Sequence, residues 1–159
     1  MKTLIIYGTK HGFAEKCAGL LKDKLQGEVT IVNVSKGNVP DIRLFDNIIV
    51  GGSTYMGQIQ KEVKSFCSKN LNLLKDKRVG IFICGMNNQD LDAQLNNSFP
   101  EELLANAIAK EHFGGEVVFR NINFFERFIM KKVGKIDKDT SRASEENIDK
   151  FSNMIKCKF

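Results

Sequence analysis

Polar loops containing glycine follow three of the apolar runs in this 159-residue chain. The first loop, residues 8–14, begins Gly8-Thr9 and runs directly into a helical pattern. Small and hydroxyl residues let backbone N–H groups close around an anion, and a helix N-terminus adds partial positive charge. Lys10 and His11 could add positive charge at the same place. The loop therefore indicates a site for a single phosphate group.

This first loop lacks the motifs of two large nucleotide-binding classes. It has no G-x-x-x-x-G-K-[ST] pattern, which excludes the phosphate loop of nucleotide triphosphatases, and no G-x-G-x-x-G dinucleotide pattern. An ordinary turn between a strand and a helix is the alternative interpretation of residues 8–14.

The second and third loops carry groups that suit a planar ring. Residues 51–58 contain the Ser53 and Thr54 hydroxyls, which could hold the edge of a ring while Tyr55 stacks against it. A tight turn with a surface tyrosine is the alternative interpretation. Residues 85–89 supply amide donors and acceptors beside the soft side chain of Met86. If the three loops meet at one edge of a sheet, they form one ligand site.

The elements that must position these loops are indicated by hydrophobic periodicity. Five short apolar runs are typical of strands, at 4–7, 29–34, 48–50, 79–84 and 116–120. Apolar stripes at helical spacing predict helices at 13–27, 59–67, 103–108, 125–133 and 148–155. This alternation predicts an α/β fold, a three-layer sandwich around a five-stranded parallel sheet of order 2-1-3-4-5. Ligands of such sheets bind beyond the carboxyl ends of strands 1 and 3.

Two helix starts can also be predicted. Ser98 and Glu101 have the spacing of a capping box before an apolar helical stripe, whereas the residues before Ser98, from 86 onward, are polar. Ser144, followed by two glutamates, suits the start of the last helix.

Composition narrows the class of protein. A composition of 42% apolar and 27% charged residues, together with the length of the chain, predicts one soluble globular domain spanning residues 1–159. The four cysteines are scattered without a C-x-x-C pair, which favours free thiols and no metal site. No signal peptide or membrane-spanning run is visible, so a cytoplasmic location is expected. The net charge is +5, but the sequence contains no nucleic-acid recognition motif, so we expect no nucleic-acid partner.

The first strand and loop, residues 4–15, resemble the opening strand and FMN-phosphate loop of the flavodoxins. Thr9 and Gly12 match the family pattern of hydroxyl, any, hydroxyl, Gly, Asn, hydroxyl, and Lys10 falls at its open position. Three positions depart from this pattern and remove two hydroxyl donors and an amide: His11, Phe13 and Ala14.

Residues 45–58 resemble the family's approach to the flavin-ring loop. The chain is most similar to the subgroup that contains the menaquinone-dependent protoporphyrinogen oxidases, because that subgroup carries late segments like 125–132 and 137–140. The resemblance implies a flavodoxin-like fold with bound FMN. Together, the resemblance and the chemistry of the third loop predict these FMN-binding residues: Thr9, Lys10, His11, Gly12, Phe13, Ala14, Ser53, Thr54, Tyr55, Met56, Gly57, Gly85, Met86, Asn87 and Asn88.

The resemblance implies an FMN protein that carries electrons between redox partners. Two alternatives stay open: an FMN- and quinone-dependent dehydrogenase, and a flavodoxin-fold binding module without cofactor. No residue is marked as a general acid or base, so no catalytic residue is assigned. We expect a redox protein or a quinone as partner. The basic, aromatic segment 124–135 is either a peripheral membrane contact or a packed helix with a solvated basic face.

Overall fold

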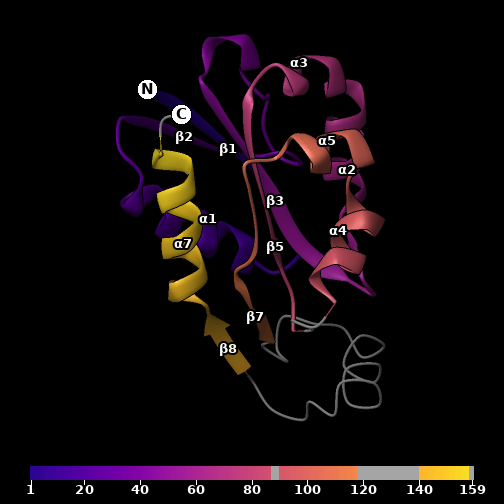
Figure 1. Ribbon diagram of the computed structural model, residues 1–159. Coiled ribbons are helices and arrows are strands. Elements are labelled where there is room, and N and C mark those ends of the chain that lie inside the picture. The colour runs from indigo at the N-terminus through magenta and orange to yellow at the C-terminus, as the bar shows by residue number, and fades with distance from the viewer. Residues whose placement is uncertain (87–89, 118–139, 158–159) are drawn as a thin grey trace.

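The computed structural model describes residues 1–86, 90–117 and 140–157, and these build a parallel sheet between two layers of helices (Figure 1). The sheet has the spatial order β2-β1-β3-β5-β6, with all four neighbouring pairs parallel. Its strands are β1 (Lys2–Gly8), β2 (Glu28–Asn33), β3 (Asn47–Tyr55), β5 (Arg78–Cys84) and β6 (Ala109–His112). The short β4 (Gln58–Ile59) pairs antiparallel with β3. A separate antiparallel pair consists of β7 (Gly114–Val117) and β8 (Thr140–Ala143).

The helices divide between the two faces of the sheet. One face carries α1 (Phe13–Lys24) and α7 (Glu145–Lys156). The other carries α2 (Lys61–Lys69), α3 (Leu71–Lys75), α4 (Leu91–Ser98) and α5 (Glu101–Asn106), as Figure 1 shows. A single 3₁₀ turn, η1 (Ile42–Leu44), precedes β3. Ser144 begins α7 as predicted, because its hydroxyl accepts a hydrogen bond from the Asn147 N–H at 3.4 Å.

Alternating side chains of each central strand fill two separate cores. In β1, Leu4 and Ile6 join the core beneath α2 to α5, whereas Ile5 and Tyr7 join the core beneath α1 and α7. Both faces of the strand are therefore buried, which is why its sequence is continuously apolar. Burying each large apolar side chain contributes about 1.5–3 kcal/mol to folding.

The predicted three-layer α/β fold and the 2-1-3-4-5 order of the five parallel strands are confirmed. The position of the fifth strand was wrong. We predicted residues 116–120, but the fifth parallel strand is β6, and Glu116 and Val117 belong to β7 instead. Lys110 and Glu111 gave β6 the polarity of a surface segment, because this strand lies at the edge of the sheet.

Two further elements differ from the prediction. Strand β3 continues through the two glycines to Tyr55, so Ser53 and Thr54 are strand residues rather than loop residues. The polar stretch before Ser98 forms helix α4, and the predicted capping box is absent. Helix α5 begins after Pro100, and the Ser98 hydroxyl accepts a hydrogen bond from the Ile59 N–H at 3.0 Å instead.

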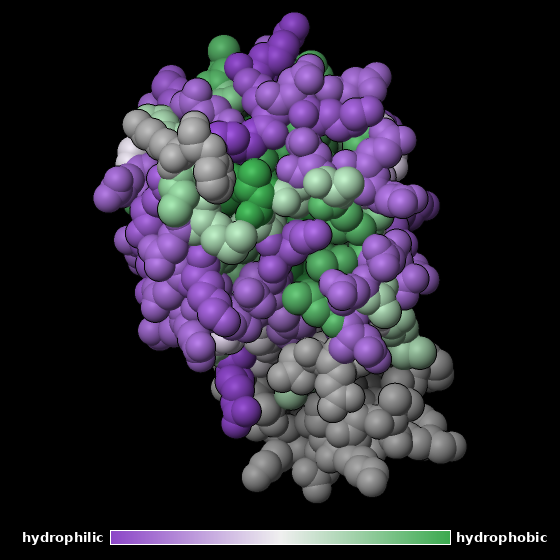
Figure 2. Space-filling view, viewed as in Figure 1, coloured by the Kyte–Doolittle hydropathy of each residue, from purple (hydrophilic) through white to green (hydrophobic). Residues whose placement is uncertain are grey.

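The surface seen in Figure 2 is hydrophilic over most of the two helical layers. Apolar side chains reach that surface between the layers, near the edge of the sheet at β6. Within the described parts of the chain, no helix is long and apolar enough to cross a lipid bilayer.

Candidate functional site

A hollow of about 110 Å³ lies at the carboxyl end of β1, β3 and β5. Parallel strands end together at one edge of a sheet, so the loops that follow them meet there. Eight residues selected from the sequence line this hollow: Lys10, His11, Phe13, Ser53, Thr54, Tyr55, Gly85 and Met86. Two residues not selected from the sequence, Gln60 and Cys84, complete the lining.

The other predicted site residues lie around this hollow or outside the described chain. Thr9 and Gly12 form the loop before α1, and Ala14 is buried in its first turn. Met56 and Gly57 form the turn between β3 and β4. Asn87 and Asn88 fall outside the described residues.

The loop between β1 and α1 is held in a left-handed turn. Gly12 has φ of 94°, which only glycine adopts without strain, and its N–H donates to Thr9 Oγ1 at 2.9 Å. The Lys16 N–H donates back to the Gly12 carbonyl at 3.1 Å. The N–H groups of residues 13–15 lie before this bond and point out of the helix N-terminus, where an anion is stabilised.

Lys10 and Tyr55 connect the first loop to the end of β3. The Lys10 Nζ atom lies 4.8 Å from the centroid of the Tyr55 ring, within the range of a cation–π interaction. Tyr55 remains 37% exposed, so part of its ring is open to another planar group. A positive charge and an aromatic face therefore share one wall of the hollow.

His11 differs from Lys10 in charge at neutral pH. Partial burial lowers the pKa of His11, and the neighbouring Lys10 ammonium lowers it further. The imidazole is therefore mainly neutral at pH 7. Lys10, not His11, supplies the positive charge that this loop was expected to contribute.

Gln60 places an unsatisfied polar atom in the wall of the hollow. Its side-chain Oε1 is buried, and it has no hydrogen-bond partner among the described residues. The amide lies against Gly8 at the end of β1, where any added Cβ would clash with Oε1. Buried polar atoms are normally hydrogen-bonded, so an unpaired one marks a place for a ligand or water. No local sequence pattern indicates such an atom, since only the folded chain leaves it unpaired.

Beside the hollow, a hydrogen-bond network holds the end of β3. The Thr54 hydroxyl lies 3.1 Å from the Cys84 carbonyl oxygen and 3.0 Å from Oε1 of Gln94 in α4. Met56 and Gly57 then turn the chain into β4 with φ values of 53° and 76°, a left-handed pair typical of tight hairpins. Met56 is 70% exposed at the tip of this turn. The end of β3 is thus fixed while its tip projects into solvent.

Cys84 lines the hollow as an unreactive thiol. Burial is the main cause that raises its pKa well above the ordinary range, and a hydrogen bond with Cys17 adds to this effect. Burial also raises the pKa of Cys67 to about 12. Among the described residues the cysteines are free thiols, and of these Cys157 is exposed. In the same part of the chain, no three His, Cys, Asp or Glu side chains gather as a metal site would require.

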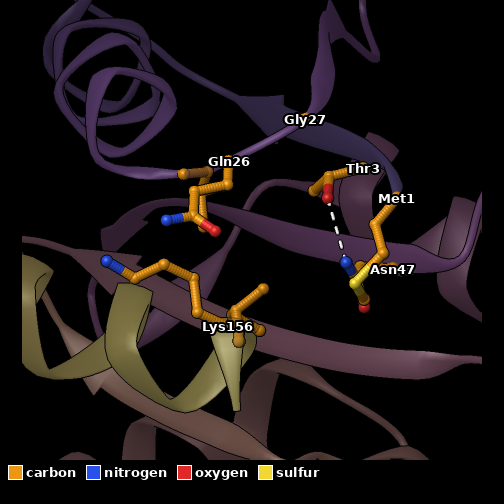
Figure 3. Close-up of a pocket in the computed structure, with 8 residues that line it drawn as sticks. Met1, Thr3, Gln26, Gly27, Asn47 and Lys156 are labelled. Carbon is orange, nitrogen blue, oxygen red and sulfur yellow. Dashed lines mark hydrogen bonds between the residues drawn. The ribbon is translucent and has the colours of Figure 1, made fainter. Parts of the chain in front are cut away.

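A second hollow of about 280 Å³ lies at the opposite, amino end of the sheet (Figure 3). Its buried polar groups satisfy one another: Asn47 Nδ2 donates to Thr3 Oγ1 at 3.0 Å, the bond dashed in Figure 3. The Arg78 Nε–H donates to Asn47 Oδ1 at 3.1 Å. This hollow is larger than the first, but its buried side chains are already paired.

The model of the flavodoxin domain matches residues 4–144, and the chain belongs to this family. A search of curated proteins found no match.

Solved structures share the fold at low sequence identity. A short-chain flavodoxin associated with a bacterial microcompartment matches with a TM-score of 0.62 and 18% identity, covering 97% of this chain and 95% of that one. Flavodoxin 2 from Bacillus cereus matches with a TM-score of 0.60 and 23% identity, and the match covers 98% of this chain and 96% of that one. The FMN-bound flavodoxin of Fusobacterium nucleatum matches with a TM-score of 0.54 and 16% identity, and the match covers 98% of this chain and 96% of that one.

Larger proteins contain the same fold as one part. The rubredoxin oxygen:oxidoreductase of Desulfovibrio gigas matches with a TM-score of 0.54 and 15% identity, over 96% of this chain. This chain spans about a third (34%) of the length of that protein.

Proposed function

We propose that this chain binds FMN at the carboxyl end of its sheet and carries electrons between redox partners. The observation that carries the proposal is the meeting of three features in one hollow: the N-terminus of α1, the Lys10–Tyr55 wall and the unpaired Oε1 atom of Gln60. The FMN-bound flavodoxin of Fusobacterium nucleatum has the same fold and supports the choice of ligand.

The residues of the hollow suit the chemical parts of FMN. The backbone N–H groups at the start of α1 are donors for a phosphate. Tyr55 offers a partly open ring for stacking, and Ser53 and Thr54 line the same hollow. Gln60 lines the hollow, and its unpaired Oε1 atom is an acceptor for a ribityl hydroxyl. His11, Phe13 and Ala14 lack the family's hydroxyl and amide groups, so backbone donors must bind the phosphate with less side-chain help.

FMN supplies the redox chemistry, since its ring accepts one or two electrons. The protein's residues position the ring and limit its contact with water. Phe13 and Met86 provide apolar walls, and Lys10 provides a positive charge beside the ring position.

FMN uptake by the purified chain tests the proposal. We expect the protein with added FMN to retain yellow colour through gel filtration and to quench FMN fluorescence in a saturable titration. Gly12→Val, which forces a branched residue into the left-handed turn, should abolish binding. If the wild-type chain takes up no FMN, the proposal is wrong and a binding module without cofactor is favoured.

The quinone-linked dehydrogenase and the partners stay predictions. The resemblance to the protoporphyrinogen oxidase subgroup rests mainly on segments such as 125–132, which lie outside the described residues, as does the basic segment 124–135. Quinone-dependent oxidation of protoporphyrinogen by the FMN-loaded chain would support the enzyme. Absence of turnover would leave the carrier. The cytoplasmic location is likewise a prediction, which cell fractionation tests.

A further inference from the structure

We propose that Lys10 makes the site hold reduced FMN more tightly than it otherwise would. This inference rests on the proposed function and adds a role for one residue of the same site. Lys10 thus becomes a positioning residue that sets the balance between the two oxidation states, rather than a ligand of the phosphate alone.

The first observation is where the Lys10 side chain lies. By sequence, Lys10 belongs to the loop that precedes α1. Its ammonium nevertheless lies 4.8 Å from the centroid of the Tyr55 ring, at the end of a different strand. Both side chains line the same hollow. The positive charge is therefore placed beside the aromatic ring on which a planar ligand would stack.

The second observation concerns the other charges near this wall. Burial raises the pKa of Tyr7, and the charge of Glu15 in the first turn of α1 and its hydrogen bond with the Tyr7 hydroxyl raise this pKa further. His11 is mainly neutral at pH 7 because burial and Lys10 lower its pKa. Of the two side chains that could carry positive charge in this loop, Lys10 is the one that does so at neutral pH.

The charge has a defined effect on the redox equilibrium. Oxidised FMN gains two electrons and one proton to give the reduced ring as an anion, with dithionite as the electron donor in the experiment below. An ammonium near the ring attracts this added negative charge and has little interaction with the neutral oxidised ring. It therefore tightens binding of reduced FMN relative to oxidised FMN.

The test compares dissociation constants for oxidised FMN in air and for dithionite-reduced FMN without oxygen. In Lys10→Met, we expect the preference for reduced FMN to fall at least fivefold from its wild-type value. Lys22→Met is the matched control, since Lys22 is an exposed lysine in the last turn of the same helix. In Lys22→Met, the ratio of the dissociation constants for oxidised and reduced FMN should stay within twofold of the wild-type ratio. Lys10→Arg, which keeps the charge and the cation–π contact, should restore most of the preference.

A second readout needs no flavin. The chain has two tyrosines and no tryptophan, and Tyr7 is buried, so acrylamide quenching of tyrosine emission reports mainly on Tyr55. Quenching should increase in apo Lys10→Met and stay unchanged in Lys22→Met. If the wild-type chain binds no FMN, the proposed function fails. If it binds FMN but Lys10→Met keeps the wild-type ratio, the inference alone is overturned.

Discussion

The two ends of the sheet differ in how their polar groups are used. At the amino end, Asn47 is 2% exposed and is hydrogen-bonded to Thr3 and Arg78 beside the larger hollow. At the carboxyl end, the smaller hollow contains an unpaired Gln60 oxygen and a lysine placed against an aromatic ring. The difference shows what distinguishes a candidate binding site from a gap in the packing. The distinction lies in unpaired polar atoms and in charged side chains held at the hollow, not in the volume of the hollow.

The direction of the strands explains this difference. In a parallel α/β fold, helix N-termini gather at the carboxyl end of the sheet and helix C-termini at the amino end. The loop before α1 therefore presents N–H donors to the first hollow. The second hollow is lined instead by Leu25 and Gln26 after the end of α1, and by Lys156 at the end of α7. We expect substitutions at the amino end to change stability and those at the carboxyl end to change ligand binding.

The largest effect is expected at the amino end. Asn47→Leu should lower the free energy of unfolding by about 2–4 kcal/mol, because it leaves Thr3 and the Arg78 guanidinium without their buried partner. Urea unfolding of the apo protein measures this loss. FMN affinity should be unchanged in the fraction that is folded. Gln26→Leu, at an exposed residue lining the same hollow, should change stability by less than about 0.5 kcal/mol.

The second effect belongs to the carboxyl end. Tyr55→Ala should weaken FMN binding by about 5–150-fold, the range that corresponds to about 1–3 kcal/mol of stacking. The free energy of unfolding should change little, since the ring is partly exposed. Fluorescence titration measures the affinity, and Tyr55→Phe, which keeps the ring, serves as control. Equal affinities for Tyr55→Ala and Tyr55→Phe would place the flavin ring elsewhere.

A third substitution separates the two ends most sharply. Gln60→Leu replaces an amide whose buried oxygen is unpaired by an apolar side chain of similar size, so the apo protein should be unchanged or up to about 1 kcal/mol more stable. FMN affinity should fall about fivefold, equivalent to about one hydrogen bond. Thermal unfolding and FMN titration of the same preparation give both values. A stability loss as large as that of Asn47→Leu would mean that the two ends do not differ in this way.

The smallest effect is expected from pH. The pKa of His11 is lowered in the folded chain from its ordinary value of 6.5, so the unfolded chain binds a proton first as the pH falls. Stability should therefore decrease slightly as the pH drops below about 6.5. His11→Gln should flatten this slope in urea unfolding between about pH 5 and pH 8. Lys10→Met should reduce it as well, because the Lys10 charge is one cause of the lowered pKa.

The fold could be predicted from the sequence where burial is symmetrical. The runs of β1, β3 and β5 are apolar on both faces, so their strand character and order follow from pattern and handedness alone. Edge strand β6 was missed because Lys110 is exposed and Glu111 partly so. Helix α4 was missed because its buried residues include polar Gln94 and Ser98, whose hydrogen bonds to β3 and β4 exist only in the folded chain.

The site could be predicted only in part for a similar reason. The three loops were found because each follows an apolar run, and glycine and hydroxyl residues mark them. The contact between Lys10 and Tyr55 joins residues 45 positions apart and depends on the parallel pairing that brings the ends of β1 and β3 together. The Gln60 Oε1 atom is significant only because no described residue around it donates a hydrogen bond to it. Such tertiary features leave no periodicity in the sequence.

Met1 and Lys156 line the same hollow at the amino end, so the first residue of the chain and the end of α7 lie together there (Figure 3). A domain attached before Met1 would therefore approach the sheet from the side opposite the candidate flavin site. The loops of that site would then remain accessible to a binding partner. For the same reason, joining the two ends with a short linker and opening the chain at the exposed turn between α1 and β2 should yield a permuted protein that still folds.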